Sequence, residues 1–184
     1  MKIFNSFLKV QLTIVIFVFS HFTAYCQKDN DIMEMWNSEI ENVGNRMVNE
    51  IDAELITYSS TKKIIISNNY KNGSIIFYKS NSSIIKIVRS YSIDSIQYIE
   101  NYYYRGKWPI YVDRKRNTSN NSDKFYFDKT NLMLWISENN TRLNAKSKNY
   151  KKNWSTLLEN MDKLSVIANL NGEIINENEI KIPK

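Results

Sequence analysis

The chain has 184 residues, with 25 basic and 19 acidic side chains and a formal net charge of +6. Its four glycines and two prolines are too few for a disordered or linker-rich protein.

The first 26 residues predict a secretory signal peptide. Lys2 and Lys9 precede an apolar run over 10–19, and no acidic residue occurs before Asp29. The run is shorter than the ~20 apolar residues that a membrane span requires. We therefore expect cleavage after Cys26, and a mature chain of residues 27–184 that is periplasmic or secreted and has no transmembrane segment.

Cleavage would change the available chemistry. It would remove His21 and Cys26, the only histidine and cysteine, and would lower the net charge to +4 because Lys2 and Lys9 are lost. Disulfides, thiol or imidazole catalysis and the preferred ligands of zinc would all be excluded. We expect no catalytic residue, metal or cofactor. In the alternative, a lipoprotein, Cys26 would carry lipid, but Tyr25 is larger than the small residue expected before a lipidated cysteine.

The mature sequence opens with a helical pattern over about 31–58. Asp31 can cap this helix, with Glu34 in the capping-box position. Its apolar residues recur three and four apart, which places them on one stripe: Ile32, Trp36, Ile40, Val43, Met47, Ile51 and Leu55.

Between about 62 and 138 the apolar period changes to two, which predicts strands. Short turns separate them, so neighbouring strands must be antiparallel. We expect a seven-stranded meander with a polar loop over 114–123, and Pro109 suits an edge strand or a bulge. The seven segments are 63–67, 74–79, 84–91, 95–104, 107–113, 124–128 and 132–137.

Alternation assigns these side chains to two faces. One face is expected to be buried, and it receives Ile96, Tyr98, Tyr102, Tyr104, Trp108, Ile110, Val112, Phe125, Phe127, Leu132, Leu134 and Ile136. The opposite face is mixed. Its aromatic residues are either packed or exposed for binding, and they include Tyr103, Tyr111, Tyr126 and Trp135.

A second helical pattern covers about 147–170 and stops at Asn171-Gly172. The tail from Glu173 is expected to form a short strand or a loose end. Together these elements predict one α+β domain over 27–184, with its helices packed on one face of an antiparallel sheet.

Two stretches form paired aromatic hairpins: 101–115 (NYYYRGKWPIYVDRK) and 124–137 (KFYFDKTNLMLWIS). They resemble a pattern in a group of small, uncharacterised exported bacterial proteins. In that pattern an aromatic strand reaches a Gly-Lys-type turn, and the return strand of the second copy ends in Trp before a helix. The second turn here lacks the glycine. The resemblance implies the fold and carries over no catalytic residue.

Ligand-binding candidates are the outer aromatics together with two arginines of the basic run: Tyr103, Tyr111, Tyr126, Trp135, Arg114 and Arg116. Aromatic faces suit sugar, peptide or protein, and the arginines suit an anionic polysaccharide or lipid headgroup. Export and interleaved acids argue against nucleic acid.

The sequence thus predicts an exported domain with a non-catalytic binding or structural role at the cell envelope. One alternative is a hydrolase or lyase acting on an envelope polysaccharide through carboxylates such as Glu100, Asp113, Asp128 and Glu138. Another is a carrier of a small amphipathic ligand, which would need a cavity between helix and sheet lined by Tyr and Trp.

Overall fold

The computed structural model describes residues 31–143 and 150–181. The chain divides into two compact units, residues 1–39 and Ile40–Lys184. In the first unit the described residues 31–39 are helical, and the helix continues in the second unit to residue 53. The leader and cleavage site predicted over 1–26 lie outside the described residues.

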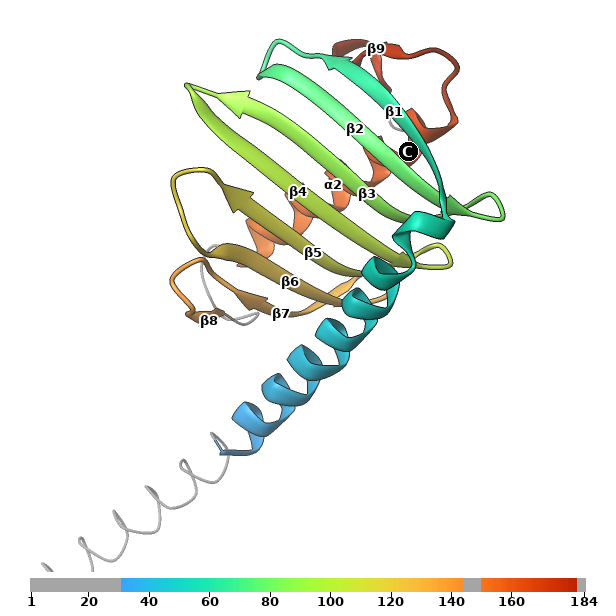
Figure 1. Cartoon of the computed structure of the whole chain (residues 1–184). Coiled ribbons are helices and arrows are strands. Elements are labelled where there is room, and N and C mark those ends of the chain that lie inside the picture. Colours follow the sequence, from blue (N-terminus) through green and yellow to red (C-terminus); the bar gives the residue numbers. More distant parts are fainter. Residues whose placement is uncertain (1–30, 144–149, 182–184) are drawn as a thin grey trace, which may run out of the picture. The chain divides into compact units, whose positions relative to one another are not determined.

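The second unit is α+β, as predicted, but its sheet has nine strands instead of seven. The strands are β1 (Ser59–Ile66), β2 (Lys71–Ser80), β3 (Ser83–Ile93), β4 (Ile96–Arg105), β5 (Trp108–Arg116), β6 (Ser122–Asp128), β7 (Asn131–Ile136), β8 (Arg142–Leu143) and β9 (Ile174–Asn176). Their order is β8-β7-β6-β5-β4-β3-β2-β1-β9 (Figure 1). The sheet is mixed, because β9 pairs parallel with β1 while the other neighbours are antiparallel.

Tight turns connect the long strands. Asn81-Ser82 and Asp94-Ser95 have positive φ at both residues, as two-residue hairpin turns of matching twist require. The polar loop is shorter than predicted, because β5 continues to Arg116 and β6 begins at Ser122. Pairing of Arg114 with Asp123 and of Lys115 with Ser122 extends the ladder into this polar stretch.

The two helices of this unit pack on opposite faces of the sheet, which corrects the expectation of one face. Helix α2 (Tyr150–Asn169) lies behind the sheet in Figure 1 and shares a core with Tyr102, Val112 and Phe125. Residues 40–53 pack on a second cluster: Tyr103, Tyr111, Tyr126, Leu134 and Ile136. Successive side chains of β4–β6 are large, so bulky side chains lie on both faces of the sheet. Each face therefore needs a helix to bury it.

Two bulges correct the predicted faces. Register shifts leave Ile110 of β5 and Met133 of β7 without a partner. Each extra residue shifts the alternation by one, so the side chains beyond it point to the face opposite to the predicted one. Ile110, Leu134 and Ile136 therefore lie in the cluster beneath residues 40–53, and Trp135 lies in the core beneath α2. Pro109 is beside the first bulge, as its missing amide allows.

The ends of the elements differ from the predicted bounds. The first helix stops at residue 53, and a 3-10 turn, η1 (Leu55–Thr57), precedes β1. The predicted start of the second helix falls among residues 144–149, outside the described residues. The tail forms β9 followed by a second 3-10 turn, η2 (Glu177–Glu179), so the strand alternative is the one observed.

Candidate functional site

The structure does not bring the four aromatic candidates together. Tyr103 and Tyr126 are buried, and their hydroxyls donate to Asp52 Oδ2 at 3.0 Å and Asn45 Oδ1 at 3.1 Å. Tyr111 lies between them, with ring centroids 5.6 and 5.0 Å away. Burial and the charge of Asp52 raise the pKa of Tyr103. These tyrosines form the contact between helix and sheet.

Trp135 is on the other face. Its ring stacks on Phe125 at 5.4 Å in the core beneath α2. The side chain is buried, and its Nε1 donates to Asp123 Oδ1 at 3.4 Å. Trp135 therefore contributes packing to the core and does not extend the tyrosine cluster.

The two arginine candidates are paired with acids. Arg114 Nε donates to Glu100 Oε1 at 2.7 Å, and Arg116 Nε donates to Glu138 Oε2 at 3.1 Å. Arg116 Nη2 forms a second bond to the same carboxylate. Each guanidinium is already paired with a carboxylate, so these two arginines do not form a free anion-binding patch.

Glu100 is fully buried at the centre of a charged network. It lies 3.6 Å from Arg89 Nη1 and accepts from the hydroxyls of Tyr102 at 2.6 Å and Tyr91 at 3.0 Å. Burial alone would raise the pKa of Glu100, but the charges of Arg114 and Arg89 and the hydrogen bond from Tyr102 lower it. Glu100 therefore stays ionised, and it cannot serve as the acid of a hydrolase.

The tail completes this network. Arg89 Nη2 donates to Glu177 Oε1 at 3.2 Å, and Tyr70 also donates to the Glu177 carboxylate. Burial raises the pKa of Tyr70 to about 12. Arg89 and Glu177 were not predicted as site residues from the sequence. One signal was available: Arg89 follows Ile87 by two residues in an apolar strand, and a charge at such an inward position needs a buried partner.

Three tyrosines line one edge of this network. Tyr91 stacks on Tyr98 at 5.2 Å with an interplanar angle of 9°, and Tyr70 is 5.0 Å from Tyr91. The Arg89 guanidinium lies 4.9 Å from the Tyr91 ring and 5.0 Å from the Tyr70 ring. All three rings are part-exposed. We call Tyr70, Tyr91 and Tyr98 the tyrosine ladder.

A cleft of about 770 Å³ opens beside Tyr70, where the β1–β2 and β3–β4 turns lie next to each other (Figure 1). We call it the polar cleft, since amide and hydroxyl side chains dominate its lining: Ser67, Asn68, Asn69, Tyr70, Lys71, Asn72, Ser92, Ile93, Asp94 and Ser95. Two backbone amides in its wall already have acceptors. Asn69 N donates to Ser67 Oγ at 3.2 Å, and Asn68 N donates to Asn178 Oδ1 at 3.3 Å. The side-chain amides of Asn68 and Asn69 are exposed.

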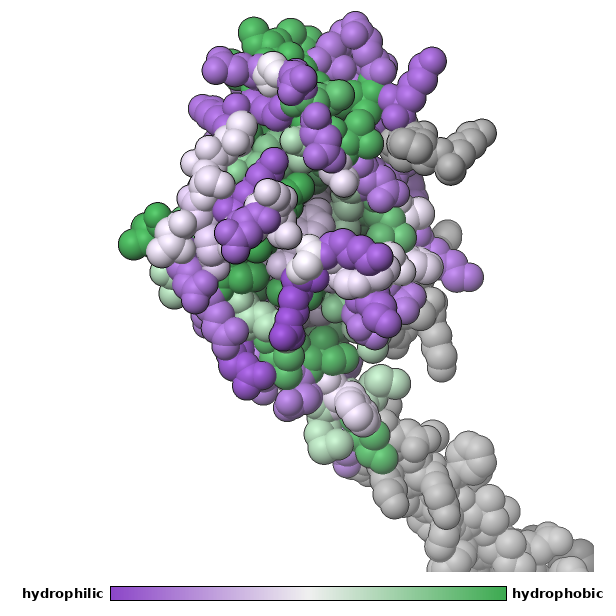
Figure 2. Space-filling model, turned by 90° about the vertical axis from the view of Figure 1, so that its right-hand side faces the viewer, coloured by the Kyte–Doolittle hydropathy of each residue, from purple (hydrophilic) through white to green (hydrophobic). Residues whose placement is uncertain are grey.

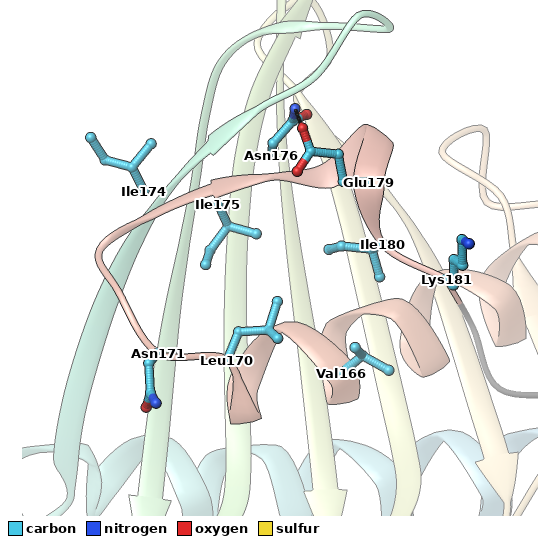
Figure 3. A pocket seen from close by; sticks show the side chains of 9 residues that line it. All are labelled: Val166, Leu170, Asn171, Ile174, Ile175, Asn176, Glu179, Ile180 and Lys181. Atoms are coloured by element: carbon cyan, nitrogen blue, oxygen red, sulfur yellow. Dashed lines mark hydrogen bonds between the residues drawn. The ribbon is translucent and has the colours of Figure 1, made fainter.

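A groove of different chemistry lies beside α2. It measures about 430 Å³, and its apolar lining comes from α2, β9 and the tail. Figure 3 shows Ile175, Ile180, Leu170 and Val166 directed toward one another, while Ile174 points away. We call this the aliphatic groove. It lacks the Tyr and Trp lining that the carrier hypothesis expects.

A third hollow, of about 490 Å³, lies between residues 46–51 and the β4–β5 turn. On the side of the molecule seen in Figure 2, hydrophobic residues form small groups separated by hydrophilic ones. The charged side chains that line the third hollow are of both signs: Arg46, Glu50 and Arg105.

The described residues contain no group of three or more His, Cys, Asp or Glu side chains placed to hold a metal ion. Within the same residues, no helix has the length and apolarity needed to cross a bilayer. The chain matches no protein-family model, no curated protein and no solved structure.

Proposed function

We propose that this protein is an exported, non-catalytic domain that binds a polysaccharide of the cell envelope in the polar cleft. One observation carries the proposal: an open cleft of about 770 Å³ is lined mainly by amide and hydroxyl side chains beside the tyrosine ladder. The export signal predicted over 1–26 and the resemblance to small exported bacterial proteins support this location.

The chemistry of the lining fits sugars better than other envelope ligands. Each hydroxyl of a sugar both donates and accepts, and the Asn amides of the cleft offer both functions. Tyr70 offers a ring to the apolar C–H face of a sugar ring. Lys71 and Asp94 balance in charge, so the cleft does not select an anionic headgroup.

Carboxylate catalysis finds little support in this cleft. Glycoside hydrolysis normally needs two carboxyl groups, one of them with a raised pKa. Asp94 is the one carboxylate in the lining, and the buried Glu100 is held ionised. The hydrolase alternative would need a second acid that the described part of the cleft does not supply.

The test is a binding screen of the purified protein against envelope polysaccharides, by thermal shift and then calorimetry. A ligand of the native state raises stability by about 2.7 kcal/mol at one hundred times its Kd. Asn69→Ala should weaken binding several-fold. Asn121→Ala is a matched control, because Asn121 N donates to Ser119 Oγ at 3.2 Å in the same local pattern and Asn121 does not line the cleft. An equal loss of glycan affinity in both variants, or a wild-type protein that binds no glycan, would refute the proposal.

The aliphatic groove favours a second function, carriage of a small amphipathic ligand. Its lining places four aliphatic side chains around a shared space with Lys181 at the rim. A fluorescent fatty acid should bind there, and Val166→Trp should displace it by filling the groove. Fatty-acid binding unaffected by Val166→Trp would remove this alternative.

A further inference from the structure

The sheet carries an open apolar surface on the face opposite α2. Four isoleucines on this face are 40–63% exposed, and we call them the isoleucine face: Ile64, Ile66, Ile99 and Ile174. Ile174 pairs with Ile64, and Ser74 and Ser90 connect Ile64 to Ile99 across β2 and β3. Helical residues 40–53 pack on the tyrosines of β4–β6 instead. Residues 40–143 and 150–181 therefore leave the isoleucine face uncovered.

The isoleucine face is bordered by positive charge. Lys115 pairs with Ile99, and Lys62 and Lys124 lie in the neighbouring cross-strand row. Asp113 lies in the same row and accepts from Asn101 Nδ2 at 3.3 Å. Three lysines against one aspartate leave a basic rim around an apolar centre, which suits an acidic, apolar partner.

The first unit of the chain supplies a segment with that chemistry. Residues 31–39 (DIMEMWNSE) are helical and carry three acids and no basic residue. Their large apolar side chains are exposed, from 44% for Ile32 to 63% for Met35, with Trp36 at 60%. Exposed apolar residues gathered within two helical turns are unusual in a protein without a partner.

We propose that residues 31–39 of one copy bind the isoleucine face of a second copy. The next part of the same helix shows the packing mode, since Ile40, Val48 and Ile51 pack on the sheet. There Asp52 pairs with Lys86 at 2.7 Å and Glu41 with Arg142 at 3.1 Å. Each copy carries both surfaces, so a symmetric dimer would cover both at once.

Charge-reversal variants test the proposed dimer, and sedimentation equilibrium of the purified proteins measures the dimer Kd. Lys62→Glu with Lys115→Glu should raise the dimer Kd about tenfold or more, and so should Glu34→Lys with Glu39→Lys. Combining all four changes should restore association. Lys151→Glu, on the exposed side of α2, is the control and should leave the Kd unchanged. A monomeric wild type, or a dimer indifferent to these changes, would overturn the proposal.

Disulfide trapping identifies the occupant. In a Cys26→Ser background, a chain carrying Trp36→Cys is mixed with a differently tagged chain carrying Ile64→Cys. A disulfide joining the two tags supports docking between copies. In a chain carrying both substitutions, a crosslink formed only within one chain would contradict it, as would vesicle binding by a monomer through Trp36.

Discussion

A Cβ added to Gly44 would lie 2.5 Å from Cδ1 of Tyr126, far inside van der Waals contact. The helix therefore meets the sheet where its side chain is smallest, and the ring of Tyr126 fills the space. Tyr126 is almost fully buried and is tied by its hydroxyl to Asn45. Glycine in a helix interior lowers helix stability, but this contact requires it at position 44.

Gly44→Ala should destabilise the protein by about 1–2 kcal/mol. Helix propensity alone would favour alanine by ~1 kcal/mol, but overpacking against a buried ring costs ~1–3 kcal/mol. Asn42→Ala, on the exposed side of the same helix, should be neutral or slightly stabilising. Urea unfolding of both variants decides the sign, and stabilisation by Gly44→Ala would mean that the helix does not pack on Tyr126.

Glu100→Gln should be among the most destabilising polar substitutions, at about 3–5 kcal/mol. It leaves the buried Arg89 and the part-buried Arg114 without their shared carboxylate. Glu138→Gln is the matched control, because its pair with Arg116 is part-exposed and should matter little. Chemical denaturation measures both, and equal losses would show that burial of Glu100 does not govern the network.

Stability should fall in acid because of Glu100. Its pKa in the folded state lies below the ordinary value of 4.5, so the unfolded chain takes up the proton first. The contribution of Glu100 is complete above about pH 4.5 and is lost as the pH falls toward the folded pKa. Free energies of unfolding measured between pH 7 and pH 3 should drop less steeply in Glu100→Gln. Parallel curves would contradict the assignment.

The sequence predicted the meander because strand period and turn chemistry are local. It failed on the faces of Leu134, Ile136 and Trp135, since a bulge at Met133 adds one residue that alternation cannot reveal. It also missed β8, of two residues, and gave the three-residue β9 only as one of two alternatives for the tail. Elements this short depend on pairing with a distant strand, as Ile174 does with Ile64, and their own residues carry too little signal.

The site was harder to predict for a related reason. Tyr103, Tyr111 and Tyr126 were correctly placed on one face, but the sequence left open whether a helix covers them. The polar cleft joins turns about 25 residues apart, and Glu177 reaches Arg89 across 88 positions. Such contacts follow from the topology of the whole sheet. An inward-facing charge such as Arg89 was the one local clue.

Lys63 should hold the end of α2 to the sheet. The side chain is buried, and its Nζ donates to the carbonyls of Leu170 and, at 3.3 Å, of Gly172. A cation there satisfies carbonyls after the helix C-terminus and complements the helix dipole. Lys63→Met keeps the apolar stem but removes these charge-assisted bonds, so stability should fall by about 2–3 kcal/mol.

Hydrogen exchange locates the effect of Lys63→Met. The amide of Ile64 donates to the Glu173 carbonyl at 2.7 Å, directly beside this lysine. Loss of Lys63 should therefore speed exchange at Ile64 and in β9 before it affects β4–β6. Lys151→Met, an exposed change on α2, should leave exchange unaltered. If amide exchange became faster by the same factor across the whole sheet, Lys63 would contribute only to global stability. Unchanged exchange rates in β9 would refute its role in docking the tail.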